Sequence, residues 1–168
     1  MIPIELREDI DRYIAENFIE EIIVEPDYIT NIAKEKGLDD SVPKKEVFSL
    51  EDILNEVGES FHEMLFMRID MSGMTDVEIY KRANIDRKLF SKIRSNPAYH
   101  PRKQTVLALA IALKLNLEDT VDLLSRAEYA FSPGNKGDLI VKYFIEQGIY
   151  DIMAINFALD EYNLPILE

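Results

Sequence analysis

The residues best suited to a chemical role gather in one basic stretch near the middle of the chain. From Lys81 to Lys103 the chain has eight lysines and arginines and a single acid, Asp86, which gives this stretch a net charge of +7. A local cluster of cations is what phosphate binding requires, whatever the charge of the whole chain. The same cluster also fits a solvated helical face that happens to be basic. The eight bases are Lys81, Arg82, Arg87, Lys88, Lys92, Arg94, Arg102 and Lys103.

Catalysis and metal binding find little support in the sequence. The 168-residue chain has no cysteine, which excludes disulfides, thiol nucleophiles and zinc–cysteine sites. Its two histidines, His62 and His100, are far apart and lack the spacing of metal ligands. Adjacent acids such as Asp160 and Glu161 are typical surface pairs, because general acid–base catalysis needs a buried carboxyl group with a perturbed pKa. We therefore expect no catalytic residue, no metal, no cofactor and no enzymatic activity.

The charge is unevenly distributed along the chain. A net charge of −13 argues at first against nucleic acid as a partner. However, residues 1–60 hold 17 acids and 6 bases, whereas residues 61–100 hold 5 acids and 7 bases. The acidic N-terminal segment therefore either shields the basic stretch or leaves it accessible. That segment is also a second candidate surface, for a basic protein partner. Its candidate contacts are Glu16, Glu20 and Glu21.

Hydrophobic periodicity predicts an all-α protein, since no segment alternates like a strand. An acidic amphipathic helix is expected from Leu6 to about Ile22, followed by a shorter helix over Tyr28–Lys36. The polar residues 37–49 are interpreted as a linker that closes an N-terminal segment, residues 1–49. A domain of five helices is expected over residues 50–131. Its helices are Phe61–Met71, Thr75–Ala83, Arg87–Ser95, Arg102–Leu115 and Leu117–Ala127.

A C-terminal helical hairpin is expected over residues 132–168, formed by helices at about Lys136–Gln147 and Asp151–Tyr162. These helices are more apolar than a simple appendage needs. They are expected either to close the core of the five-helix domain or to form a dimer face. No stretch is apolar enough to span a membrane, and the first residues do not resemble a secretory signal, so a cytoplasmic protein is expected.

The segment from Thr75 to Ile93 has the pattern of a helix-turn-helix. Thr75 and Glu78 form a capping box, Asn84 tolerates a positive φ in the turn, and Asp86 can cap the second helix. The core-facing positions are expected to be Ile79, Ala83, Ile85, Phe90 (or Leu89) and Ile93. The outward positions on the second helix are expected to be Arg87, Lys88, Ser91, Lys92 and Arg94.

The stretch from about Phe61 to Leu124 resembles the lambda-repressor-like, Cro/C1-type helix-turn-helix family. Residues 105–116 are similar to the fourth helix and following turn of that family. More specifically, Thr75–Asn96 and the later helices resemble a module at the C-terminal end of larger bacterial proteins, some of them similar to macro-domain proteins of ADP-ribose metabolism. The chain departs from the family pattern at Tyr80, Asn84 and Phe90, where a small alanine, a glycine and a valine or isoleucine are usual. These departures predict a repacked helix pair.

The resemblance implies double-stranded DNA binding by a transcriptional regulator, commonly as a homodimer. At family positions that contact bases, this chain has Arg87, Lys88, Ser91 and Lys92, while Arg94, Arg102 and Lys103 would suit phosphates. The alternative is an acidic adaptor or inhibitor, of the DNA-mimic kind, that docks on a basic nucleic-acid-handling protein.

Overall fold

The computed structural model describes residues 2–20 and 58–168, and this part of the chain is entirely helical. It contains eight α-helices and no strand, which confirms the all-α prediction. The helix predicted over residues 28–36, the linker, the boundary at residue 49 and Glu21 lie outside the described residues. The helices are α1 (Ile4–Asn17), α4 (Phe61–Ser72), α5 (Asp76–Arg82), α6 (Arg87–Ser95), α7 (Lys103–Ala112), α8 (Leu117–Arg126), α9 (Lys136–Glu146) and α10 (Ile152–Glu161).

The first helix ends earlier than the predicted limit near Ile22, because its backbone becomes extended directly after Asn17. Phe18 has φ −76° and ψ 125°, and the N–H of Ile19 donates to the carbonyl oxygen of Pro133. Residues 2–19 belong to the same compact unit as residues 59–168. Helix α1 is therefore part of the described helical body and packs on α9.

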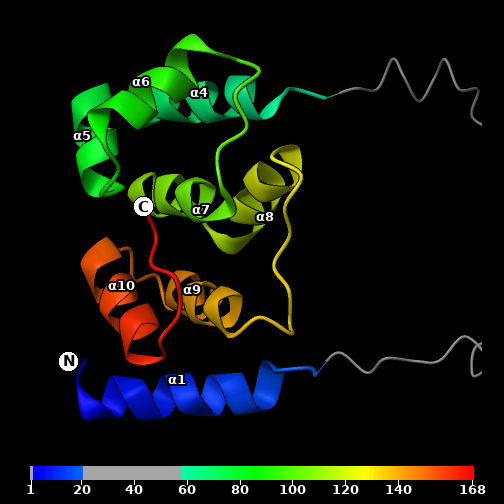
Figure 1. Cartoon of the computed structure of the whole chain (residues 1–168), viewed down its shortest axis with the longest axis vertical. Coiled ribbons are helices and arrows are strands. Elements are labelled where there is room, and N and C mark those ends of the chain that lie inside the picture. The colour runs from blue at the N-terminus through cyan, green and yellow to red at the C-terminus, as the bar shows by residue number, and fades with distance from the viewer. Residues whose placement is uncertain (1, 21–57) are drawn as a thin grey trace, which may run out of the picture. The chain divides into compact units, whose positions relative to one another are not determined.

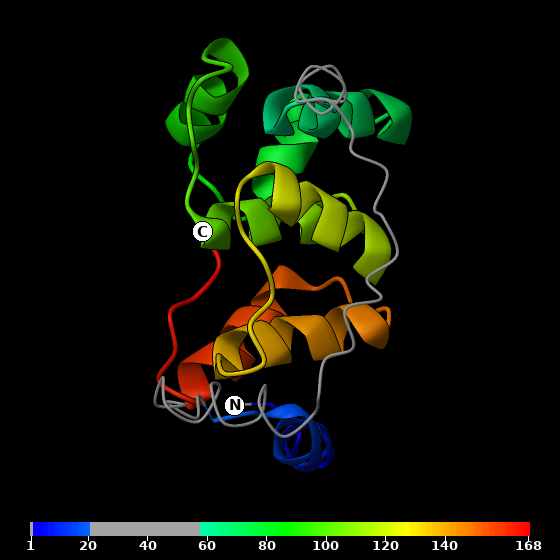
Figure 2. The same cartoon turned by 90° about the vertical axis from the view of Figure 1, so that its right-hand side faces the viewer.

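The helices of this unit form successive layers (Figures 1 and 2). Helices α4, α5 and α6 lie at one end, α7 and α8 come next, α9 and α10 follow, and α1 lies at the other end. Helix α7 packs on α5, α8 and α10 and is the central element. Every residue from Thr105 to Ala112 is buried, which explains why this helix has no polar face.

The C-terminal hairpin contributes mainly to the core. Ile140, Phe144 and Ile155 are completely buried, so the apolar content of these helices is used inside the unit. Two large side chains of α10, Met153 and Phe157, remain about half exposed at 51% each. No helix in the described part of the chain is long and apolar enough to cross a membrane.

Candidate nucleic-acid interface

Helix caps and a turn formed by residues close together in the sequence determine the α5–α6 pair. The hydroxyl of Thr75 accepts from the N–H of Glu78 at 3.3 Å, and the Glu78 carboxylate accepts from the N–H of Thr75 at 2.8 Å. These hydrogen bonds, first that from the backbone of Thr75, lower the pKa of Glu78. Asn84 has φ +54° in the turn, and Asp86 caps α6 by accepting from the N–H of Lys88 at 2.7 Å. The predicted caps and turn are confirmed.

The predicted core-facing positions of the pair are also confirmed. The following five residues are each at least 94% buried: Ile79, Ala83, Ile85, Phe90 and Ile93. Leu89 is only half-buried, which assigns the inward position to Phe90. The rings of Tyr80 and Phe90 lie 6.0 Å apart between the two helices, and Phe66 of α4 meets Phe90 edge-on at 6.2 Å. Three aromatic rings thus occupy the centre of the contact between α4, α5 and α6.

The opposite face of α6 is exposed and cationic. Arg87, Lys88, Ser91 and Lys92 are all exposed, whereas Phe90 and Ile93 of the same helix are buried. Within the described residues, no carboxylate forms an ion pair with Arg87, Lys88 or Lys92. The ammonium of Lys92 lies 4.3 Å from the ring centroid of Tyr99, in the loop that follows α6. We call these four residues the α6 cationic face.

Arg94 has a different environment from the other bases of α6. Its Nε and Nη2 donate to the two carboxylate oxygens of Asp76, at 2.5 and 2.7 Å. Its guanidinium also lies over the ring of Phe66, 4.5 Å from the centroid. The hydrogen bonds to Asp76 raise the pKa of Arg94 above its ordinary value. The guanidinium of Arg94, which the sequence suggested for phosphate, is therefore already paired with a carboxylate of the same chain.

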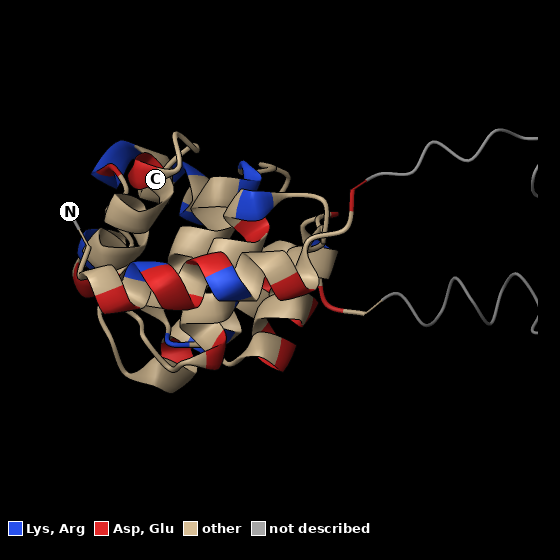
Figure 3. Ribbon diagram, turned by 90° about the horizontal axis from the view of Figure 1, so that it is seen from below, with Lys and Arg blue, Asp and Glu red and all other residues tan. Residues whose placement is uncertain are grey.

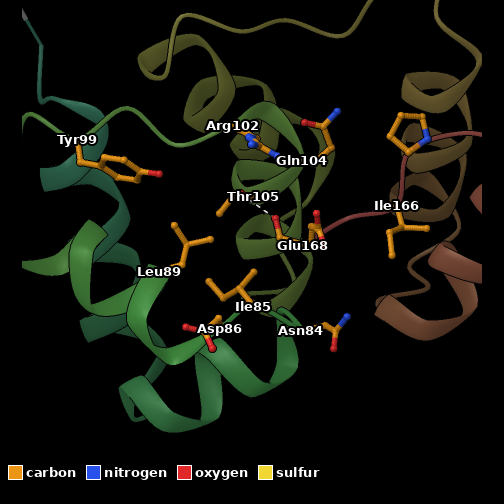
Figure 4. A pocket seen from close by; sticks show the side chains of 11 residues that line it. Asn84, Ile85, Asp86, Leu89, Tyr99, Arg102, Gln104, Thr105, Ile166 and Glu168 are labelled. Atoms are coloured by element: carbon orange, nitrogen blue, oxygen red, sulfur yellow. Dashed lines mark hydrogen bonds between the residues drawn. The ribbon is translucent and has the colours of Figure 1, made fainter.

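Arg102, just before α7, and Lys103, its first residue, have different environments. Arg102 is exposed and lines a cavity of about 750 Å³ beside α6. One wall of the cavity is the α5–α6 turn with Leu89, and the other is the start of α7 with Pro165, Ile166 and Glu168 (Figure 4). Lys103 instead pairs with Asp138 and donates to the carbonyl oxygen of Ala130, with its side chain only 21% exposed. The structure does not bring Lys103 to the α6 cationic face.

The acidic helix α1 lies at the other end of the unit from α6 (Figures 1 and 2). It buries Ile10 and Ile14 and leaves Glu16 exposed, and Glu20 is exposed just beyond its end. Figure 3 views the unit from the α1 side and shows acidic residues predominating along this helix. Helix α1 therefore does not cover the α6 cationic face.

Both histidines bond to backbone oxygens of other segments. His62 Nε2 lies 3.0 Å from the carbonyl oxygen of Arg94, and His100 Nε2 lies 2.7 Å from that of Ala127. Among the residues that the structure describes, no three or more potential metal ligands come together. The site geometry thus consists of an exposed cationic helix face and a neighbouring cavity.

No protein-family model, no curated protein and no solved structure matches this chain.

Proposed function

We propose that the chain is a non-catalytic DNA-binding protein whose α5 and α6 form a Cro/C1-type helix-turn-helix, with a role in transcription regulation. The observation that carries the proposal is the α6 cationic face. Arg87, Lys88 and Lys92 are exposed on a nine-residue helix whose Phe90 and Ile93 are buried in the core. A helix with such a face fits the major groove of duplex DNA.

The chemistry of the face suits base recognition. Arginine and lysine donors pair with the O6 and N7 acceptors of guanine, and a serine hydroxyl can pair with several base edges. Arg102, exposed beside the same helix, would reach a phosphate of the flanking backbone. Arg94 and Lys103 are left out of the interface, because their cationic groups already bind Asp76 and Asp138.

The acidic residues of helix α1 do not argue against DNA binding by α6. Charges repel or attract strongly only within about one Debye length, ~8 Å at physiological salt. Helix α1 is separated from α6 by the layers of α7, α8, α9 and α10 (Figure 1). The carboxylates of α1 therefore weaken DNA binding less than their number suggests.

A direct test is fluorescence anisotropy with labelled genomic duplex fragments at ~50 mM and ~200 mM salt. The wild type should bind with strong salt dependence, and Arg87→Ala with Lys92→Ala should weaken binding at least about tenfold. The control is Arg7→Ala with Arg12→Ala, which removes the same charge from α1. This control should bind like the wild type. Absence of salt-dependent binding by the wild type to any fragment contradicts the proposal.

The second candidate function is docking of the acidic N-terminal segment on a basic, nucleic-acid-handling protein. It is favoured by the outer face of α1, where Glu5, Glu8 and Glu16 are exposed while the apolar face is buried in the unit. Neutralising Glu16, Glu20 and Glu21 to glutamine would abolish such docking and leave DNA binding unchanged or tighter. Affinity capture of a basic protein by the wild type and not by this variant would support it.

A further inference from the structure

Arg94 lies where three helices meet. Its guanidinium holds both carboxylate oxygens of Asp76, at the start of α5, and covers the ring of Phe66 on α4. Its carbonyl oxygen, near the end of α6, lies 3.0 Å from Nε2 of His62, near the start of α4. The imidazole of His62 also contacts the ring of Phe66 in a tilted arrangement, with the ring centroids 4.6 Å apart. One residue of α6 is thus bound to both helices on which α6 packs.

The geometry of these contacts constrains orientation more than a single surface ion pair does. A two-point arginine–carboxylate contact fixes both the distance and the plane of the two groups. The ring of Phe66 limits movement of the guanidinium out of that plane, because the cation is attracted to the ring face. The backbone contact to His62 holds the C-terminal end of the helix. Together these contacts restrain the rotation of α6 and the angle between α5 and α6.

We propose that Arg94 is a positioning residue, which fixes α6 against α5 and α4 through Asp76, Phe66 and His62 so that the α6 cationic face is presented as one surface. Arg94 in this role does not contact phosphate. The inference rests on the proposed DNA-binding function of α6. It also explains why an acid stands at the start of α5, beside a helix that binds a polyanion.

The two roles of Arg94 predict opposite effects of Asp76→Asn. If Arg94 contacted phosphate, this change would free its guanidinium and remove a repulsive charge, so that DNA binding would become tighter. If Arg94 positions α6, the same change removes a charge-assisted contact and loosens the helix pair. We expect Asp76→Asn to weaken duplex binding about three- to tenfold in spite of its more favourable charge.

Glu78→Gln is the matched control. It removes one negative charge from the same turn of α5, and glutamine can retain the capping contact with Thr75. This variant should bind DNA as tightly as the wild type or slightly more tightly. Equal or tighter binding by Asp76→Asn, as by Glu78→Gln, would overturn the positioning role.

Hydrogen exchange of the amides in α5 and α6 separates this inference from the proposed function, since it needs no DNA. Asp76→Asn should speed exchange in both helices while leaving α9 and α10 unchanged, and Glu78→Gln should not. If the wild type binds no DNA, the proposed function fails, and faster exchange in Asp76→Asn still supports the coupling of the helices through Arg94. Unchanged exchange in α5 and α6 contradicts that coupling.

Discussion

The ammonium of Lys103, in the first turn of α7, forms an ion pair with the carboxylate of Asp138, in the first turn of α9. The same carboxylate accepts from the N–H of Ser132 at 2.7 Å, and Lys103 also donates to the carbonyl oxygen of Ala130. The Asp138 side chain is only 7% exposed. This pair therefore ties the C-terminal hairpin and the loop before it to the central helix.

Lys103→Met should lower the free energy of unfolding by about 3 kcal/mol, because it leaves the buried carboxylate of Asp138 without its cation. Urea denaturation measures the change. Lys142→Met is the control, since its surface pair with Glu146 at 3.7 Å contributes at most about 1 kcal/mol. DNA affinity should be the same in both variants. A selective loss of affinity in Lys103→Met would show that Lys103 does contact phosphate.

Arg102→Gln should weaken binding to every duplex by a similar factor. An arginine that contacts only phosphate carries no sequence information, and its loss should reduce the slope of log affinity against log salt by about 1. Lys88→Gln, on the α6 cationic face, should instead change the order of preference among duplexes. Anisotropy titrations over a series of salt concentrations measure both effects. An unchanged slope for Arg102→Gln would remove Arg102 from the interface.

Asn156→Ala should cost about 2 kcal/mol of unfolding free energy, because two buried backbone groups lose their partners. The Asn156 amide donates to the carbonyl oxygen of Leu167 at 3.0 Å, and its oxygen accepts from the Leu167 N–H at 2.8 Å. Hydrogen exchange of the Leu167 amide should become much faster. Asn17→Ala is the control, since among the described residues that amide bonds to Tyr13 within α1 alone. Persisting protection of Leu167 would count against this role of Asn156.

The stability of the protein should fall between pH 10 and pH 12 partly through Tyr162. Burial, and then the hydrogen bond that its hydroxyl donates to Asp11, raise the pKa of Tyr162 from 10.0 to about 12. A raised pKa in the folded state gives stability that is complete below pH 10 and is lost as pH rises through 12. Tyr162→Phe should therefore show a smaller fall in this window by urea denaturation. Part of the fall remains, because burial also raises the pKa of Tyr13 and Tyr143.

An equal fall in wild type and Tyr162→Phe would contradict this assignment. The ultraviolet absorbance of tyrosinate provides an independent check, since the variant should lack one phenol that titrates near pH 12. The control is Tyr150→Phe, at the α9–α10 junction, which should keep that late titration.

Much of the α5–α6 pair could be predicted because its determinants are local. The capping box at Thr75, the positive φ at Asn84 and the cap at Asp86 each involve residues within a few positions of one another. The burial of Phe90 and Ile93 follows from helical periodicity, which also places Arg87 and Lys88 outward. The end of α1 was placed too late, because the extended backbone at Phe18 depends on a distant contact with Pro133.

The sequence by itself determined the α5–α6 pair, its caps and the cationic side of α6, since these depend on spacing along one chain segment. Only the tertiary structure decided which cations are already paired. Arg94 finds Asp76 18 positions away, and Lys103 finds Asp138 35 positions away. Such pairs depend on how helices cross, and the separation of α1 from α6 likewise depends on layer packing. Charge counts could not show either, because they locate charges in sequence and not in space.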